Sequence, residues 1–560
     1  MEKIPDFIDF VLENEIELSP YLDICYSPSR GYHILLSSEV KNSLFRNTPL
    51  ARIPKSAVLS ASSSLLCNLL PDDQQRSLAG LVLAYLTEKA LGSRSPWYRY
   101  LDMLPIREES CLRFWGHNEQ EWVRDTDAAD VLRAADEDLL EMYDTVAAPF
   151  YESQREVIKA AIGKNISWEE FSSKKTFADA LSVVAARCFE IDAFIGLGLC
   201  PIADLFNHSD HEDVHFETRY EVCEWCGSND TCEHDAHALR EAAGENENEI
   251  ESDAEPPVIE NGDKLDIKDI YSESDENDDD HDDDDDDDKD RDTCDIVVHK
   301  RIVISQKGGI REQKKEVFNS YGPLSSAQLL VKYGFAIRRN AHDYLSLERE
   351  MRALYRENGI PWRRHDNSDH DMIDGAAHVG RDAYVEEVDG PSGQDEWEDM
   401  SEDEAGTEHE YDLGRDHDGG SAGHDVEGEL KIDMRGRANV HLWNRLVLYC
   451  VLTGYTPSAN AYRDVLGVFN SSGSSLSNCL SETTRHVIET LRNLLGRRWD
   501  RYSDGGILST EYDYVISEEV TSRVLTDRES KKRNALIVLA NEKEMLELAK
   551  ARCDKALGDI

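Results

Sequence analysis

A chain of 560 residues is too long for one ordinary hydrophobic core, so two or more domains are expected. Its formal net charge of −53 argues against direct binding to nucleic acid and favours a basic protein as partner. The first 30 residues are acidic and lack a basic region before an apolar core, which argues against a signal peptide, and the sequence contains no apolar run of about 18 residues that would indicate a membrane span.

The negative charge is concentrated in two stretches. Residues 241–295 hold 27 acidic against 4 basic residues, and residues 366–430 hold 23 against 2. They contribute −23 and −21 to the net charge, so only −9 remains for the other residues. Neither stretch carries enough apolar side chains to offset the loss of chain entropy on folding, so both are predicted to be disordered inserts. They would attract a basic partner or serve only as solvated spacers.

The twelve cysteines are mostly scattered singly among apolar residues, as at Cys67, Cys188, Cys200 and Cys450. This pattern is typical of reduced thiols in a core. Because reduced thiols persist in reducing compartments, we expect a location in the cytoplasm or the nucleus.

The chain opens with a predicted helix over 4–18, where apolar residues recur at helical spacing. Predicted strands follow over 32–36 and 49–54. Arg30 and Gly31 lie at the turn before the first of these strands, and a glycine there lets the backbone approach a ligand closely. An ordinary hairpin turn is the alternative.

Residues from about 72 to 180 predict a helical insert packed on a β core, and a helix is predicted over 177–194. Arg187 lies on the apolar side of that helix, where a guanidinium is costly to bury unless it is paired. The alternative is that its side chain extends to the surface.

Asn207 and His208 lie between an apolar turn and a predicted strand over 214–217. An amide and an imidazole at such a place can hold a loop or contact a ligand. Both interpretations stay open from these two residues alone.

Residues 218–240 carry a local cluster of cysteine and histidine. Cys223 and Cys226 form a Cys-x-x-Cys-Gly turn that presents two thiolates to one metal ion, and Cys232 with His234 or His237 completes a tetrahedral set. The cluster therefore predicts a structural zinc site, with free thiols on a loop as the alternative.

Predicted strands resume over 296–298 and 301–304, and they are expected to close a sheet with the 214–217 strand. The first acidic stretch would then be a loop excursion from a single domain. Residues 317–335 predict a short strand, a turn and an amphipathic helix. Tyr321 lies at the end of that strand and is our candidate for the reaction centre, with a plain turn residue as the alternative.

Beyond Phe335 the pattern is helical over 344–355, 438–453, 481–495 and 530–555. Apolar positions in these segments are those of a helical core. The economical interpretation is a second, all-helical domain.

The order of five motifs resembles the SET-domain methyltransferases, in particular the Rubisco-methyltransferase-like branch that includes the fungal ribosomal lysine methyltransferases. The resemblance covers about residues 20–217 and 296–340, and more loosely the helical C-terminal part. The motifs are Arg30-Gly31, the insert with Pro96-Trp97 to Pro105, Arg187-Cys188-Phe189, Asp204-Leu205-Phe206-Asn207-His208 and Asn319-Ser320-Tyr321-Gly322.

This resemblance implies an α+β fold. A SET domain over 1–340 would have a core of short β-sheets with the helical insert, and an all-helical substrate-binding domain would follow over 341–560. It implies S-adenosylmethionine as cofactor and Tyr321 as the catalytic residue, which also contacts the cofactor. The other implied cofactor contacts are Arg30, Gly31, Tyr32, Arg187, Asn207 and His208, and the implied substrate contacts are Phe189, Tyr333 and Phe335.

The sequence departs from the family pattern after Tyr321, where Ser325-Ser326 replaces the usual Ser-Asn pair. This puts one cap or loop contact in question, although serine still caps a helix well. A second departure lies beside Arg30, where the usual glycine-rich turn is reduced to Gly31 followed by the bulky Tyr32.

The implied function is methylation of a lysine side chain in a basic protein, and a ribosomal protein is the first candidate for that target. The enzyme itself is expected to be a monomer. A histone or another protein lysine is the alternative target, and one branch of the family methylates histidine. The competing class is a non-catalytic acidic protein that binds basic clients like a chaperone. Binding of S-adenosylmethionine by the purified protein discriminates between the two classes.

Overall fold

A computed structural model of the chain describes residues 3–28, 30–37, 43–229, 232, 234, 292–302, 315–362, 430–455, 482–502 and 525–558. The predictions of disorder for the two acidic stretches concern residues that lie outside this set, except for 292–295 and 430. The prediction was wrong at 293–295, because these residues belong to a strand that pairs with two others. His237, the alternative metal ligand, also lies outside it. Within the described part of the chain, no helix combines the length and the apolar character that crossing a membrane requires.

The N-terminal part contains a four-stranded antiparallel sheet. Its strands, in spatial order, are β1 (Glu17–Leu18), β4 (Pro49–Pro54), β9 (Thr293–Val298) and β8 (Val214–Thr218). Strand β8 pairs with β9 from Val214 opposite Val298 to Thr218 opposite Cys294. The sheet therefore closes between strands on either side of the first acidic stretch, as predicted. Among the described residues 299–302, Ile302 forms an isolated bridge with Leu44 and no strand is formed, while residues 303–304 of the predicted 301–304 strand lie outside the described residues.

Three two-stranded pairs complete the β structure of this part. Two are antiparallel hairpins and one is a parallel pair that joins distant segments. They are β2 (Leu22–Ser27) with β3 (Gly31–Leu36), β5 (Cys188–Asp192) with β6 (Gly196–Leu199), and β7 (Asn207–His208) with β10 (Phe318–Asn319). The parallel pair brings the Asn-His motif alongside the segment that ends at Tyr321.

Two predicted helices are shorter than expected. Helix α1 (Ile4–Glu13) ends before Glu15, whose backbone is left-handed at φ 56°, and Leu18 belongs to strand β1. The prediction of a helix over 177–194 was wrong beyond Ala185, where helix α10 (Lys174–Ala185) ends. The apolar run after Arg187 forms strand β5 instead, because it pairs with β6 in a hairpin. A short apolar run fits both the helical period and the strand period, so periodicity alone does not distinguish a helix from a strand there.

The segment between residues 72 and 185 is helical, as the sequence predicts. Its α-helices are α2 (Asp72–Gln75), α3 (Leu78–Leu91), α4 (Tyr98–Met103), α5 (His117–Gln120), α6 (Asp127–Met142), α7 (Ala148–Ser153), α8 (Arg155–Ile162), α9 (Trp168–Phe171) and α10. Shorter turns are the 3-10 segments η1 (Lys55–Ala57), η2 (Gly92–Arg94), η3 (Leu112–Phe114) and η5 (Ala203–Leu205), and the π-helical turn η4 (Tyr143–Ala147).

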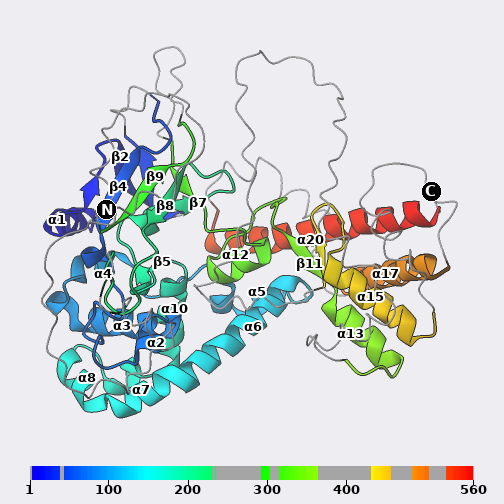
Figure 1. The fold of residues 1–560 in the computed structure, drawn as a ribbon, viewed down its shortest axis with the longest axis horizontal. Helices are drawn as coiled ribbons and strands as arrows, with labels where there is room; N and C mark the ends of the chain where they lie inside the picture. Colours follow the sequence, from blue (N-terminus) through cyan, green and yellow to red (C-terminus); the bar gives the residue numbers. More distant parts are fainter. Residues whose placement is uncertain are drawn as a thin grey trace, which may run out of the picture.

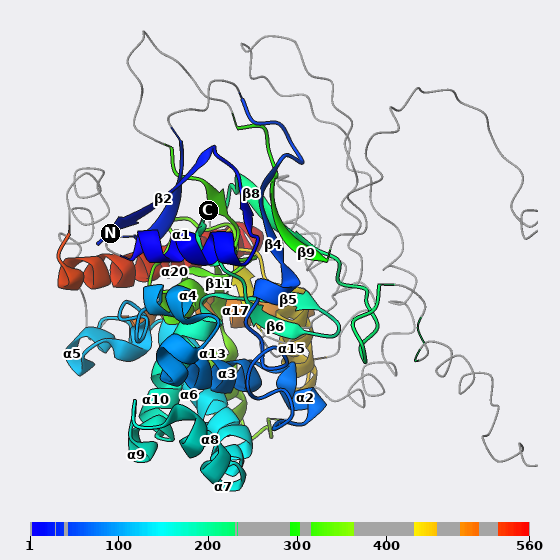
Figure 2. The ribbon, with the colours of Figure 1, turned by 90° about the vertical axis from the view of Figure 1, so that its left-hand side faces the viewer.

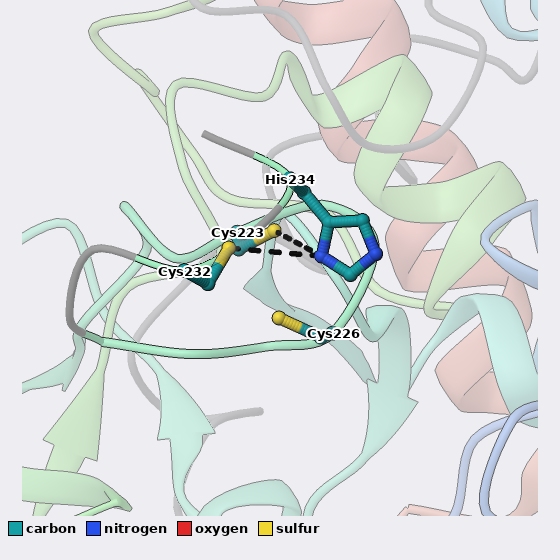
Figure 3. Close-up of side chains that lie close together, drawn as sticks. All are labelled: Cys223, Cys226, Cys232 and His234. Atoms are coloured by element: carbon teal, nitrogen blue, oxygen red, sulfur yellow. Dashed lines mark hydrogen bonds between the residues drawn. The ribbon is translucent and has the colours of Figure 1, made fainter. Parts of the chain in front are cut away.

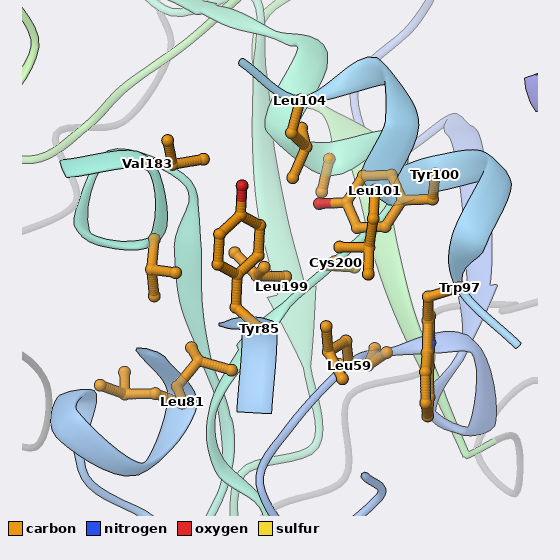
Figure 4. Packing of buried hydrophobic residues seen from close by; sticks show 14 of the residues in the cluster. Leu59, Leu81, Tyr85, Trp97, Tyr100, Leu101, Leu104, Val183, Leu199 and Cys200 are labelled. Carbon is orange, nitrogen blue, oxygen red and sulfur yellow. The ribbon is translucent and has the colours of Figure 1, made fainter. Parts of the chain in front are cut away.

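Serines begin several of these helices. Ser77 accepts a hydrogen bond from the backbone N–H of Gly80 at the start of α3, and Ser173 accepts one from Thr176 at the start of α10. Helix α3 is buried on nearly all sides, and Figure 4 shows its Tyr85 among Leu101 of α4, Leu199 of β6 and other apolar side chains. Figures 1 and 2 show these helices at one end of this part of the molecule and the strands β2, β4, β8 and β9 at the other.

The C-terminal part is mainly helical. Its elements are α12 (Ser326–Lys332), β11 (Tyr344–Ser346), α13 (Glu348–Glu357), β12 (Lys431–Asp433), α15 (Val440–Leu452), α17 (Glu482–Asp500) and α20 (Asp527–Leu557). The prediction that residues 341–560 are all-helical was wrong, because β11 pairs with β12 from Tyr344 opposite Asp433. The fully buried Leu345 and Ile432 oppose each other in this pair and explain why it forms.

Helix α20 packs on two separate cores. Its N-terminal half contributes Ala535, Ile537 and Val538 to a cluster with α12 and the helical insert, and its C-terminal half contributes Met545 and Cys553 to the core around α13, α15 and α17. Figure 1 shows the helix extending from beside α12 to beside α17. One helix thus packs both on α12 with the helical insert and on the bundle of α13, α15 and α17.

Candidate active site

Tyr321 is held by the strand pair β7–β10. Its backbone N–H donates to Nδ1 of His208 at 3.0 Å, and its hydroxyl donates to the carbonyl of Phe206 at 3.2 Å. Burial of the hydroxyl raises the pKa of Tyr321 well above its usual value. The hydroxyl therefore stays protonated at physiological pH and acts as a fixed donor and dipole, which suits orientation better than strong base catalysis.

Four rings form an aromatic cluster, which we define as His208, Tyr321, Tyr333 and Phe335. The ring of Tyr321 stacks on Tyr333 at 4.5 Å and on His208 at 5.2 Å, and Phe335 lies 6.0 Å from His208. The structure thus brings together the predicted catalytic residue, one predicted cofactor residue and two predicted substrate residues. Such a group of rings forms an apolar wall that keeps water from a bound amine.

The two aromatic residues beyond α12 depend on a glycine between them. Gly334 has φ 81°, and a Cβ atom there would lie 2.4 Å from the backbone of Ser110. Only glycine fits this close approach without displacing the insert. The turn therefore fixes both rings against His208 and Tyr321.

Glu316 joins two predicted cofactor residues. Its carboxylate pairs with the guanidinium of Arg30 and accepts a hydrogen bond from the side-chain amide of Asn207 at 2.8 Å. Glu316 is buried, whereas more than half of the Arg30 side chain is exposed. Sequence reasoning missed Glu316. A carboxylate directly before the apolar strand residues Val317-Phe318 was the available signal, since a buried acid needs a partner.

Arg187 is paired inside the protein, so the alternative of a surface-directed side chain is wrong. Its guanidinium donates to Glu108 Oε1 at 2.7 and 3.1 Å, and to the carbonyl of Asp204 at 3.3 Å. Although burial opposes the charge, Glu108 and Asp204 raise the pKa of Arg187 above its usual value. Glu108 was not found from the sequence, because it lies 79 residues before its partner.

Asp204 links Arg187 to the insert and the reaction centre. Its carboxylate lies 3.7 Å from Arg187 and accepts a hydrogen bond from the hydroxyl of Tyr100 at 3.1 Å. Burial raises the pKa of Asp204 to about 6, and the charge of Arg187 opposes that rise only in part. Since Asp204 and Phe206 offer their carbonyls to Arg187 and Tyr321, this one turn orients both predicted site residues.

Open space lies beside the glycine of the β2–β3 turn and beside the glycine that follows Tyr321. Gly31 has φ 68° and no heavy atom within 4 Å of the position that a Cβ would take, and Gly322 at φ 91° is equally open. The hydroxyl of Ser27, opposite Gly31 in the hairpin, is buried without a hydrogen-bond partner among the described residues. Exposed backbone and an unsatisfied hydroxyl fit a polar cofactor at this end of the hairpin.

Two predicted contacts point elsewhere. The ring of Tyr32 lies 4.9 Å from Tyr26 across the hairpin, and Phe189 stacks on Phe216 of β8 at 4.7 Å. Neither pairing places these rings in the aromatic cluster. Their predicted roles rest on the resemblance alone.

The serines that depart from the family pattern both have clear partners. Ser325 caps helix α12: its hydroxyl accepts from the backbone N–H of Gln328, whose side chain accepts from the N–H of Ser325. Ser326 donates its hydroxyl to the carbonyl of Ile337 at 2.9 Å and binds Asp343. The expectation that serine still caps this helix is confirmed.

The predicted metal cluster is assembled from four of its named residues. The ligand atoms of Cys223, Cys226, Cys232 and His234 all lie within 4.8 Å of one another. Nδ1 of His234 lies 3.7 Å from Sγ of Cys223 and 3.6 Å from Sγ of Cys232. Figure 3 shows the four side chains directed toward a common space. The aromatic cluster and this group are made from different residues and different loops.

Comparison with known proteins gives two sequence relatives, while no family profile matches the chain. Ribosomal lysine N-methyltransferase 3 of Saccharomyces cerevisiae is 27% identical over 346 residues, which is 58% of this chain and 60% of that protein. An uncharacterized protein of Schizosaccharomyces pombe is 24% identical over 37% of this chain and 43% of its own length. The chain spans about three fifths, or less, of the length of these relatives.

Solved structures resemble the whole fold. The SET domain of LSMT bound to lysine and AdoHcy superposes with a TM-score of 0.54 at 14% identity, over 99% of this chain and 91% of that one. Rubisco LSMT bound to AdoMet superposes with a TM-score of 0.51 at 12% identity, over 100% of this chain and 92% of that one. The chain therefore has the mixed α and β SET fold that its motifs predict, and the predicted resemblance is confirmed.

Proposed function

We propose that this chain is an S-adenosylmethionine-dependent protein-lysine N-methyltransferase whose target is a lysine of a basic protein, with a ribosomal protein as the first candidate. The observation that carries the proposal is the position of Tyr321. Its hydroxyl donates to the Phe206 carbonyl, its ring stacks on Tyr333, and its backbone N–H donates to His208. The SET fold and the relative named for ribosomal lysine methylation support the same reaction.

Residues at the β2–β3 turn and at the turn 204–206 suit the cofactor. Asn207 and Arg30, held by Glu316, would contact its polar ends, and the backbone at Gly31 leaves room for close approach. His208 and Arg187 would complete the contacts around the turn 204–206. S-adenosylmethionine supplies an electrophilic methyl carbon on a sulfonium, which departs as a neutral thioether.

The chain has two tasks in this reaction. The target amine must lose its proton, and the amine nitrogen, the methyl carbon and the sulfur must lie in one line. The aromatic cluster favours the neutral amine, because an apolar environment disfavours an ammonium ion. Tyr321 orients the amine through its hydroxyl while nearby carbonyls accept the remaining amine hydrogens. The nitrogen lone pair forms the new N–C bond while the C–S bond breaks, so the product is a methylated ammonium beside a neutral thioether. This ammonium must lose a proton to solvent before it could accept another methyl group.

Zinc, the other predicted cofactor, would have a structural role and would take no part in methyl transfer. A neutral leaving group needs no Lewis acid. The Cys-x-x-Cys turn packs on Phe194 and Arg76, whereas Tyr321 contacts His208, Phe206 and Tyr333.

The nature of the target follows from charge. The two acidic stretches carry −23 and −21, so they would raise the encounter rate with a basic ribosomal protein or a histone. The proposal includes a monomer in the cytoplasm or nucleus, a SET domain over 1–340 and a substrate-binding domain over 341–560. Helix α20 of the second domain packs on both parts.

The deciding experiment is transfer of a labelled methyl group by the purified full chain to a cell lysate or to purified ribosomal proteins, with mass spectrometry of the modified site. We expect label on lysine. Label on histidine or on a histone would redirect the target, and no binding of S-adenosylmethionine would favour a non-catalytic acidic binder.

The matched variants are Tyr321→Phe and Tyr21→Phe, because Tyr21 is a half-exposed tyrosine on the N-terminal side of β2. Loss of one oriented polar group in a reaction centre costs about 100- to 1,000-fold in kcat. Tyr321→Phe should show that loss and still bind S-adenosylmethionine in calorimetry, while Tyr21→Phe keeps full turnover. Equal turnover of both variants would remove Tyr321 from the reaction.

A further inference from the structure

The four side chains at the base of the connection between β8 and β9 have the dimensions of a zinc site. In a tetrahedral site with Zn–S of about 2.3 Å and Zn–N of about 2.0 Å, a sulfur and a nitrogen ligand lie about 3.5 Å apart. The two sulfur-to-Nδ1 distances at His234 are 3.7 and 3.6 Å. These two distances are close to those around a bound zinc ion, and the four ligand atoms together lie within 4.8 Å of one another.

The first two ligands lie on a tight turn that is already formed. The N–H of Gly227 donates to the carbonyl of Cys223 at 2.8 Å, and the N–H of Cys223 donates to the carbonyl of Ser228 at 3.0 Å. Gly227 has φ 70°, and a Cβ there would lie 2.9 Å from the ring of Phe194. Glycine is therefore needed both for the backbone conformation and for contact with the β5–β6 hairpin.

The turn is fastened to the SET core by several contacts. Arg76 donates to the carbonyl of Glu224 at 2.9 Å and lies 3.7 Å from its carboxylate. The N–H of Ala193 donates to the carbonyl of Tyr220 at 3.2 Å. Cys223 and Cys226 are thus presented from a supported position, whereas Cys232 and His234 come from the chain that continues toward the first acidic stretch.

A buried lysine already closes the base of the same connection. Nζ of Lys55 lies 2.6 Å from Asp192, 3.0 Å from Asp292 and 3.3 Å from the carbonyl of Arg219. Arg219 directly follows β8 and Asp292 directly precedes β9. The two ends of the long connection are therefore tied together at Lys55, and the Cys/His group lies just beyond this point.

We propose that Cys223, Cys226, Cys232 and His234 bind one structural zinc ion, which ties Cys232 and His234 to the Cys-x-x-Cys turn and, through that turn, to the β5–β6 hairpin. Three thiolates and one imidazole are a ligand set that zinc prefers among the common divalent ions. Because all four positions of the tetrahedron are filled by the protein, the ion has no open position for a substrate. The site is independent of methyl transfer.

The primary test measures zinc in the full chain purified without chelator from cells supplied with zinc. The wild-type protein should hold about one zinc per chain, because four protein ligands form a complete structural site. Cys226→Ser and Cys232→Ser should lose most of it. Cys67→Ser is the matched control, since Cys67 is a half-buried cysteine outside the group, and it should keep the full content.

A second pair of variants tests the imidazole. His234→Ala removes a ligand and should lower zinc retention after dialysis, while His234→Cys supplies a thiolate in its place and should restore it. Cobalt exchange provides a spectroscopic check, because a tetrahedral cobalt–thiolate site absorbs visible light. Removal of the metal by a chelator should also expose three additional thiols to a thiol reagent.

Contrary results are equally clear. Wild-type protein without zinc, or a disulfide between Cys223 and Cys226 under reducing purification, would overturn the proposal. Equal zinc in wild type, Cys226→Ser and His234→Ala would show surface-bound metal only and would overturn it too. None of these measurements depends on methyl transfer, so they separate this proposal from the proposed enzymatic function.

Discussion

The backbone N–H of Tyr321 donates to Nδ1 of His208 across 3.0 Å, so this imidazole must keep Nδ1 unprotonated. Its Nε2 lies 3.3 Å from a carboxylate oxygen of Asp210, which identifies Nε2 as the nitrogen that carries the proton. His208 therefore works as an acceptor that sets the position of the Tyr321 backbone.

The variants His208→Asn and His208→Ala should differ in activity, because asparagine can place a hydrogen-bond acceptor near the position of Nδ1 and alanine cannot. An unsatisfied buried N–H costs about 1–3 kcal/mol. We expect kcat/KM of His208→Ala to fall by roughly 10- to 100-fold, which is that free energy expressed as a rate ratio, and His208→Asn to retain most activity. Steady-state kinetics with the labelled cofactor measures both. Equal losses of kcat/KM in the two variants would mean that a hydrogen-bond acceptor at the position of Nδ1 is not required.

The same imidazole gives a pH dependence. Burial lowers the pKa of His208, with Asp210 opposing, so the folded state favours the neutral ring. Its contribution to stability is present above the unfolded pKa of about 6.5 and is lost as pH falls through the lower folded pKa. The melting temperature of the wild type should drop more steeply from pH 7 to 5 than that of His208→Asn. Parallel curves for the two proteins would contradict this assignment.

Glu316→Gln tests the link between Arg30 and Asn207. Glutamine keeps an acceptor for the Asn207 amide but loses the charge that pairs with Arg30. We expect affinity for S-adenosylmethionine to fall by about tenfold, the effect of roughly 1.4 kcal/mol. Calorimetry measures the affinity, and Glu109→Gln, at an exposed acid paired with Arg107, is the control. Unchanged affinity in Glu316→Gln would separate this carboxylate from the cofactor site.

Asp204→Asn should make the stability of the protein depend less on pH between pH 4 and 7. Burial raises the pKa of Asp204 to about 6, so its favourable contribution is fully present below the unfolded pKa of about 4 and is lost as pH rises through 6. Melting temperatures from pH 4 to 7 should therefore decline less in Asp204→Asn than in the wild type. A steeper decline in the variant would show that the pairing with Arg187 outweighs burial.

Arg498→Met and Arg497→Met compare a buried with an exposed ion pair on one helix. Arg498 is fully buried and contacts Asp127 at 2.7 Å and Glu542 at 2.9 Å, whereas Arg497 pairs with Glu357 at the surface. Removing the buried guanidinium leaves two carboxylates without it and should cost about 3–5 kcal/mol. The exposed pair should cost at most about 1 kcal/mol. Thermal unfolding of both variants checks the order.

Local patterns predicted two of the strands that carry the site. The apolar residues before Tyr321 and the glycine after Arg30 each marked a strand that the structure forms, as β10 and β3. Strands β2 and β7 were not predicted, because β7 is only two residues long and each forms by pairing with a partner strand. Motif order then added the expectation that the motifs meet. The parallel pairing of β7 with β10 is the contact that brings two of them together.

The partners of the carboxylates in the site could not be predicted from the sequence. Glu316 meets Arg30 across 286 positions, and the chain holds 114 acidic residues that look alike in sequence. Only tertiary structure shows which of them is buried beside a cation. The strand β5 and the pair β11–β12 were missed for a related reason, because short apolar segments take their conformation from a partner strand.

The position of helix α20 has a consequence for the order of folding. The cluster that packs α12 against the helical insert includes Ala535, Ile537 and Val538, so it cannot be complete while the chain is still being synthesised before these residues. The turn that carries Tyr333 and Phe335 follows α12 directly. A nascent chain would therefore complete the packing behind Tyr333 and Phe335 only after residues 535–538 of α20 had been synthesised and had docked.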